Sequence, residues 1–229
     1  MLAAFQLYGP AHLSALAILI IFTAALVRWC RKGENLPHTR ISMGILAFCC
    51  FAAFPINQIV WLNYGDNVPL DSIVPLHLCD IAAFFCGFAL ITRKDYFCEL
   101  SYFWGLAGTL QGLLTPNLAY GFPHPIFMSF FLHHSVIVCT ALVLPLGLGW
   151  CPTQGAVKRA FIGILCYAVM AMIANYLMDT NYGFLARKPN EASLLDIMPE
   201  WPFYIFILIG LALFMFWLLA LPFRNKHTN

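Results

Sequence analysis

Three residues that can take part in acid–base or nucleophilic chemistry lie within four positions of one another: His77, Cys79 and Asp80. They stand in the stretch Pro-Leu-His-Leu-Cys-Asp at residues 75–80, where a long apolar segment begins. Ionisable groups are costly inside a bilayer and usually mark function there. A cysteine thiolate needs a base or a positive neighbour, and a Cys–His pair can transfer an acyl group through a thioester. The alternative interpretation is that Cys79 is a small packing residue at a helix end.

The composition excludes a soluble globular domain. The chain has 229 residues, of which 62% are hydrophobic and 10% are charged, whereas soluble domains carry about 25% charged residues. We therefore predict an all-α, multi-pass membrane protein that forms a single domain over residues 1–229. The nine cysteines are an odd number and include no CxxC pair, so neither a disulfide framework nor a zinc knuckle is predicted.

Seven apolar stretches have roughly the length of a membrane-spanning helix, which needs about 20 mostly apolar residues. They cover residues 11–29, 42–63, 73–92, 97–114, 126–148, 159–179 and 202–222. The fourth stretch is short and contains Gly105, Gly108 and Gly112. Because small residues let helix backbones approach closely, we expect this segment to lie inside a seven-helix bundle.

The distribution of charge predicts the orientation, because cytoplasmic loops are enriched in Lys and Arg. All but two of the 12 basic residues fall on one side of the predicted membrane, and the two exceptions are Arg187 and Lys188. We therefore predict an N-terminus outside and a C-terminus in the cytoplasm. The side with the two exceptions also carries five acidic residues, Asp66, Asp71, Glu191, Asp196 and Glu200.

Several polar residues share the outer half of the predicted bundle. At 1.5 Å per residue, Cys79 lies roughly 9 Å and His134 roughly 12 Å below the outer ends of their segments. Asn57, Gln111 and Asn175 fall in the same half, which predicts one polar cavity open toward the outer leaflet or the extracytoplasmic water. These three residues can equally hold helices together by hydrogen bonds.

The helical period separates Cys79 from its sequence neighbours. His77 and Asp80 are three residues apart and share a face, whereas Cys79 faces away from His77. A base for Cys79 is therefore expected from another helix, and the candidates at matching depth are His133 and His134.

The same residues have structural interpretations. His77 and Asp80 can hydrogen-bond each other and cap the helix, and His133 can be satisfied by a hydrogen bond between helices. A metal site of His77, Cys79, Asp80 and His134 has suitable ligand types, but no HxxxH pair supports it. We therefore predict no metal and no cofactor.

Several stretches together resemble the YwaF-like, transmembrane protein 164 family over about residues 55–205. Besides residues 75–80 they are Tyr102-Phe103-Trp104-Gly105-Leu106-Ala107-Gly108 with Gln111 and Thr115-Pro116, Phe122-Pro123-His124 with Phe130-Phe131-Leu132-His133-His134, Asn175-Tyr176, Asn181-Tyr182, Lys188-Pro189, Ser193-Leu194-Leu195-Asp196 and Trp201-Pro202. As a set these motifs are specific, although each one alone is weak.

The resemblance implies a seven-helix, cysteine-dependent lipid acyltransferase that moves fatty acyl chains between phospholipids and lysophospholipids. The family's cysteine falls on Cys79 and its histidine on His134, although a tandem His133-His134 stands where the family has one histidine. We expect Cys79 as the nucleophile and His134 as the general base. Supporting or substrate-binding roles are expected for His77, Asp80, Gln111, His133, Asn175 and Asn57.

Two other functions fit the same residues. Release of the acyl group to water would make the protein a lipid hydrolase, and a polar cavity could bind a solute or lipid headgroup in a transporter or sensor. Against transport, the sequence shows no inverted repeat and no pair of broken helices. We expect the bilayer and its lipids as partners, no nucleic acid, and a multi-pass location in the plasma (inner) membrane; the oligomeric state is left open.

Overall fold

The computed structural model describes residues 4–66, 68–189 and 194–226 of the chain. Two residues used above, Glu191 and Ser193, lie outside this part. Within it the structure is helical and contains no strand, apart from an isolated bridge between Ala4 and Tyr120. The predicted all-α fold is confirmed.

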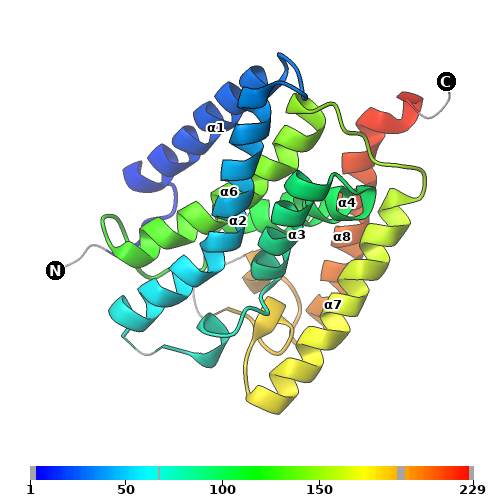
Figure 1. Cartoon of the computed structure of the whole chain (residues 1–229). Helices are drawn as coiled ribbons and strands as arrows, with labels where there is room; N and C mark the ends of the chain where they lie inside the picture. The colour runs from blue at the N-terminus through cyan, green and yellow to red at the C-terminus, as the bar shows by residue number, and fades with distance from the viewer. Residues whose placement is uncertain (1–3, 67, 190–193, 227–229) are drawn as a thin grey trace.

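The described residues contain eight α-helices, which form the bundle shown in Figure 1. They are α1 (Pro10–Cys30), α2 (Pro37–Tyr64), α3 (Leu78–Thr92), α4 (Asp95–Trp104), α5 (Leu110–Leu114), α6 (Pro125–Gly147), α7 (Ala156–Met178) and α8 (Phe203–Ala220). A π-helical turn, η2 (Gly105–Thr109), joins α4 to α5, and 3-10 turns are η1 (Leu70–Ser72), η3 (Tyr182–Phe184), η4 (Leu194–Ile197) and η5 (Leu221–Lys226).

Proline begins three of the long helices. Pro10, Pro37 and Pro125 occupy the first helical positions of α1, α2 and α6. The missing N–H of proline is not needed at this position, and its fixed φ suits the first turn. The sequence therefore marks these three starts directly.

Among the described residues, five helices are long and apolar enough to cross a membrane: α1, α2, α6, α7 and the segment Phe203–Arg224 that contains α8. They identify a multi-pass membrane protein. The other two predicted spans correspond to α3, with 15 residues, and to α4–η2–α5, which is interrupted by the π turn. The count of seven spans and the orientation of the termini stay predictions.

Helix α3 begins later than the predicted segment 73–92. It starts at Leu78, and η1 and an extended stretch precede it. Pro75 explains the difference, since a proline disfavours the helical conformation of the residue before it, Val74. Cys79 is therefore the second residue of its helix and not a residue well inside it. The depth predicted for Cys79 is counted from residue 73, which lies before the helix begins.

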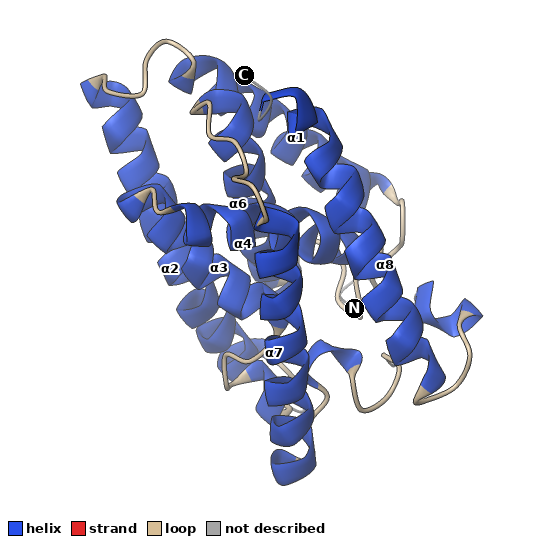
Figure 2. Cartoon of the chain, turned by 90° about the vertical axis from the view of Figure 1, so that its right-hand side faces the viewer, coloured by secondary structure: helices blue, strands red, loops and turns tan. Residues whose placement is uncertain are grey.

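Helix α6 is the centre of the bundle. In its membrane-length window 72% of the residues are buried, against 11% for the window in α8. It packs against α1, α2, α3 and α4. Figure 1 shows α1 and α2 on one flank and α7 and α8 on the other, and Figure 2 views the flank with α7 and α8 from its outer side. The side chains of α6 therefore face protein, and the outer helices present apolar side chains to lipid.

The glycine-rich segment lies inside the bundle, as predicted. Every residue from Cys98 to Leu106 is buried. A Cβ at Gly105 would lie 3.0 Å from the Cβ of Ala141, so glycine lets this segment approach α6 closely.

An ion pair between the exposed Arg159 and a buried carboxylate joins this segment to α7. The carboxylate of Glu99, which is fully buried, accepts hydrogen bonds from Nε and Nη2 of Arg159 at 2.8 and 2.6 Å. The hydroxyl of Thr153 donates to the same carboxylate at 2.6 Å. Two-pronged contacts of this kind fix orientation as well as distance, so α4 and α7 keep one relative position at this end.

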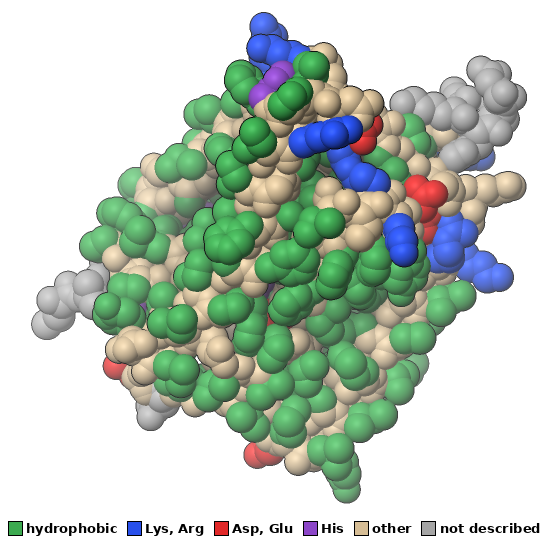
Figure 3. All heavy atoms as spheres, in the orientation of Figure 1, with side chains coloured by type: hydrophobic (Ala, Val, Ile, Leu, Met, Phe, Trp, Pro, Cys, Tyr) green, Lys and Arg blue, Asp and Glu red, His purple; other side chains and the backbone are tan. Residues whose placement is uncertain are grey.

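Charge is unevenly distributed over the surface. On the face shown in Figure 3, hydrophobic side chains cover the middle, and Lys and Arg gather toward the upper end, where the turn between α1 and α2 lies. This arrangement suits a helical bundle whose middle contacts lipid and whose ends reach water.

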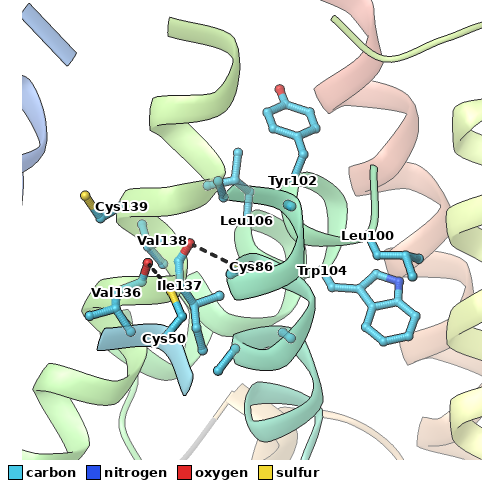
Figure 4. Close-up of a cluster of buried hydrophobic side chains, with 14 of the residues drawn as sticks. Cys50, Cys86, Leu100, Tyr102, Trp104, Leu106, Val136, Ile137, Val138 and Cys139 are labelled. Carbon is cyan, nitrogen blue, oxygen red and sulfur yellow. Dashed lines mark hydrogen bonds between the residues drawn. The ribbon is translucent and has the colours of Figure 1, made fainter. Parts of the chain in front are cut away.

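Several cysteines belong to the hydrophobic core. Figure 4 shows Cys50, Cys86 and Cys139 among apolar side chains between α2, α3 and α6. Cys50 Sγ lies 3.5 Å from Thr140 Oγ1, and Cys86 Sγ lies 3.9 Å from the carbonyl oxygen of Ile137. These thiols behave as small hydrophobic residues with a weak hydrogen bond.

Candidate active site

Cys79 lies in the first turn of α3, directly after a helix cap. His77 is the N-cap residue, and its backbone N–H donates to Asp80 Oδ2 at 3.0 Å. This bond is half of a capping box, in which the side chain at N3 reaches back to the N-cap backbone. It fixes the Asp80 carboxyl beside the thiol. In this turn the backbone N–H groups of Asp80 and Ile81 donate to the carbonyl oxygen of His77. The first N–H groups of a helix, here those of Leu78 and Cys79, have no partner within it and favour negative charge nearby.

A carboxyl, a thiol and an imidazole meet at this turn. Cys79 Sγ lies 3.9 Å from Asp80 Oδ1, and His133 Nε2 lies 3.7 Å from the same oxygen. One donor atom from each of the three residues lies within 4.8 Å of the other two. We call Cys79, Asp80 and His133 the thiol cluster.

The thiol cluster is mostly buried, and one of its nitrogen atoms lacks a hydrogen bond. Asp80 and His133 are 4% and 2% exposed, whereas Cys79 is partly exposed. Nε2 of His133 is buried and has no hydrogen-bond partner in the part of the chain that the structure describes. A buried polar atom without a partner is costly, so this nitrogen is free to take a proton or a ligand.

His134 faces a different environment from its neighbour His133. Its Nδ1 lies 2.9 Å from the carbonyl oxygen of Phe130, and its ring stacks on the ring of Phe130 with centroids 4.1 Å apart. A Cβ at Gly112 would lie 3.2 Å from His134 Nε2, so α5 covers this side of the ring. The structure thus brings His133, rather than His134, to Cys79 and Asp80.

Two of the predicted supporting residues make hydrogen bonds elsewhere. Asn57 Oδ1 accepts from the hydroxyl of Ser129 at 2.9 Å, which links α2 to α6. The side chain of Asn175 bonds the backbone of Tyr182 at 2.7 and 3.1 Å and thereby ties the end of α7 to η3. Both contacts match the structural interpretation of these residues.

The other two predicted supporting residues lie near the cluster. His77 caps α3, and its ring meets that of Tyr182 edge-on with centroids 5.1 Å apart. Gln111 lies in α5, next to the Gly112 that faces His134, and its carbonyl oxygen accepts from Thr115. Of the eight predicted site residues, the thiol cluster therefore unites three.

Two tyrosines near the cluster were missed by the site prediction. The hydroxyl of Tyr167 donates to the carbonyl oxygen of Leu76, close to the start of α3, at 3.2 Å. Tyr182 is fully buried, and its hydroxyl has no partner among the described residues. Burial, together with the charges of Asp71 and Asp80, raises the pKa of Tyr182 to about 12, so it keeps its proton at neutral pH. Only the Asn181-Tyr182 motif pointed to it in sequence.

The linings of two cavities include none of the three residues of the thiol cluster. The larger one, of about 430 Å³, lies between α3, α4 and α7, and its lining includes Ile81 and Tyr167 but not Cys79. The smaller one lies at Glu34, Arg93 and Trp150. The single polar cavity predicted in the outer half is therefore neither of these, because the polar residues there form separate hydrogen-bonded groups.

The fold and the cluster define the class of protein: an all-helical, multi-pass membrane protein with a thiol, a carboxyl and an imidazole at the start of a short helix. The chain belongs to the TMEM164 family, whose sequence model matches residues 7–220. The match covers nearly the whole chain and confirms the resemblance drawn from the motifs.

One relative is an uncharacterized protein of Treponema pallidum (strain Nichols), which is 30% identical over 156 residues. The match covers 67% of this chain, and the chain spans 63% of the length of that relative. No solved structure matches the chain.

Proposed function

We propose that the protein is an integral membrane lipid acyltransferase that moves fatty acyl chains between phospholipids and lysophospholipids through a thioester on Cys79. The observation that carries the proposal is the thiol cluster, in which a ring nitrogen of His133 lies within 4.8 Å of Cys79 Sγ. The Nε2 of this ring is buried and has no hydrogen-bond partner among the described residues. A thiol with a nearby base and an orienting third group is the arrangement of an activated nucleophile.

In the first half-reaction the histidine accepts the thiol proton, and the sulfur attacks the acyl carbonyl carbon of a phospholipid. The C–S bond forms, the ester C–O bond breaks, and the departing lysophospholipid oxygen takes the proton back from the imidazolium. Negative charge develops on the carbonyl oxygen in the transition state. The backbone N–H groups of Leu78 and Cys79, the first two residues of α3, are the proposed donors to it.

The second half-reaction runs in the opposite sense. The histidine takes a proton from the hydroxyl group of an acceptor lysophospholipid, whose oxygen attacks the thioester carbonyl. The new C–O bond forms, the C–S bond breaks, and the sulfur recovers the proton. Water in place of the acceptor would give a free fatty acid, so exclusion of water from the cluster decides between a transferase and a hydrolase.

We propose His133 as the base, in place of the His134 that the resemblance indicated. The reason is position: His133 Nε2 is 3.7 Å from Asp80 Oδ1 and close to the thiol. The Nδ1 of His134 lies within hydrogen-bond distance of the backbone carbonyl oxygen of Phe130, and its ring stacks on the ring of Phe130. We assign His134 a positioning role: it packs beside His133 and keeps that ring in place.

The topology belongs to the same proposal. Seven spans, an outer N-terminus and a cluster in the extracytoplasmic half of a plasma membrane follow from the distribution of Lys and Arg over the loops. Donor and acceptor lipids would then come from the outer leaflet.

The proposal is tested with purified protein in vesicles that contain a phospholipid with a labelled acyl chain and an unlabelled lysophospholipid. We expect label in the acceptor phospholipid, with little labelled free fatty acid. The Cys79→Ala variant should form neither product. Transfer by this variant at the wild-type rate would overturn the proposal, and label only in free fatty acid would identify a hydrolase.

A further inference from the structure

We propose that Cys79, Asp80 and His133 also form a binding site for a divalent cation of the zinc type. The three side chains supply one sulfur, one oxygen and one nitrogen donor from two helices, α3 and α6. Zinc accepts this mixture of ligands and commonly uses three protein ligands where a fourth position stays open. The sequence could not show this set, because its members are not spaced as an HxxxH or CxxC motif.

The spacing of the donor atoms fits a tetrahedral ion. Bonds of about 2.0–2.3 Å at a tetrahedral centre separate two ligand atoms by roughly 3.3–3.8 Å. The separations are 3.7 Å from His133 Nε2 to Asp80 Oδ1 and 3.9 Å from Cys79 Sγ to that oxygen. The third separation, between Cys79 Sγ and a ring nitrogen of His133, is no more than 4.8 Å. A small rotation of the side chains would bring all three donor atoms to tetrahedral spacing.

The contacts around the thiol cluster leave a nitrogen donor available and hold the carboxylate donor in position. Among the described residues, His133 Nε2 is buried without a hydrogen-bond partner, so binding requires no hydrogen bond within this part to be broken. The second oxygen of Asp80 accepts the N–H of His77 at 3.0 Å. This contact holds the carboxylate in place, as outer hydrogen bonds do around metal ligands.

Binding has a chemical consequence at the cysteine. The thiol loses its proton when it binds the ion, and the sulfur electron pair that would attack an acyl carbonyl is then engaged in the metal bond. Zinc should therefore compete with acylation of Cys79. This consequence rests on the proposed function, whereas binding of the ion does not.

Cobalt(II) titration of the purified protein in detergent tests the binding site directly. A thiolate ligand gives cobalt a charge-transfer absorption band, and zinc should displace the cobalt and remove the band. We expect the band in wild type and its loss in Cys79→Ser. His133→Ala and Asp80→Asn should weaken cobalt binding at least about tenfold.

Cys166→Ser is the matched control, because Cys166 is an exposed thiol on α7. It should leave the band and the affinity unchanged. Absence of the band in wild type would overturn the metal site, as would a band that survives Cys79→Ser or disappears in Cys166→Ser. The acyl-transfer assay, run with a chelator, separates this outcome from a failure of the proposed function.

Discussion

Two cysteines on the same face of α3 have very different surroundings. Cys79 and Cys86 are seven residues apart, or about 10 Å along the helix axis. Cys86 is fully buried, and its neighbours are a backbone carbonyl of α6, the thiol of Cys50, the hydroxyl of Ser101 and apolar side chains. Cys79 is partly exposed and lies beside a carboxyl group and an imidazole.

The difference teaches that the environment, and not the residue type, separates a reactive thiol from a structural one. A thiol gains reactivity from a base or a positive group and from access to the reactant. Cys79 has both His133 and partial exposure, whereas Cys86 has neither. Matched substitutions at the two positions therefore test the account better than a change at either one alone.

The largest expected effect is the contrast between Cys79→Ala and Cys86→Ala. Loss of the nucleophile should lower lipid acyl transfer at least about 10³-fold, while Cys86→Ala removes only a weak hydrogen bond and should keep most of the activity. Initial rates in vesicles measure both. Similar losses in the two variants would remove the distinction between the two thiols.

A second contrast separates the adjacent histidines. His133→Ala should lower the rate about 10²- to 10⁴-fold, the usual contribution of a general acid–base group. His134→Ala should have a smaller effect of about tenfold or less, because that ring only supports its neighbour. The same transfer assay at one substrate concentration and one pH compares them. If His134→Ala proves the more damaging change, the base assignment returns to His134.

Asp80 has two functions that two substitutions can separate. Asp80→Asn keeps an oxygen that can accept from the His77 N–H but loses the charge beside His133, so transfer should fall about 10- to 100-fold with the melting temperature nearly unchanged. Asp80→Ala loses the cap as well, which should cost about 1 kcal/mol of stability in addition. Activity and thermal unfolding in detergent give the two numbers. Full activity of the Asn variant would show that the charge has no role.

The smallest expected effect concerns the contact between Gly112 on α5 and the ring of His134. In Gly112→Ala the new methyl group would lie 3.1 Å from His134 Cδ2, so the ring must shift and transfer should fall by a few-fold. Gly210→Ala on α8 is the control, since its Cβ would meet nothing within 4 Å. Both changes favour the helix by roughly 1 kcal/mol. An equal activity in the two variants would exclude a positioning role for this contact.

The helical architecture was predictable because it depends on apolar runs. Prolines mark the starts of α1, α2 and α6, but the prediction did not use them, and the predicted segment 42–63 begins five residues after Pro37. The interior position of the glycine-rich segment follows from its small side chains. The start of α3 was predicted five residues too early, because apolar composition says where a chain can enter lipid and not where its backbone becomes helical. Pro75 was the available signal.

The site was only partly predictable. The sequence indicated Cys79, Asp80 and a histidine from another helix, since these properties follow from residue type and helical period. The choice between His133 and His134 depends on the rotation of α6 about its axis, which the packing of four neighbouring helices sets. The tandem histidines differ by about 100° around that axis, so one of them reaches α3 and the other faces α5.

The most direct test of the central claim is the position of the acyl group on the protein. Purified protein is incubated with an acyl-phospholipid without an acceptor, digested, and mapped by mass spectrometry before and after hydroxylamine. The account predicts a hydroxylamine-sensitive acyl adduct on the peptide that contains Cys79, at a position separable from Cys86. If no adduct forms on Cys79 while wild type and Cys79→Ala both transfer acyl chains, the protein does not act through a thioester on this residue.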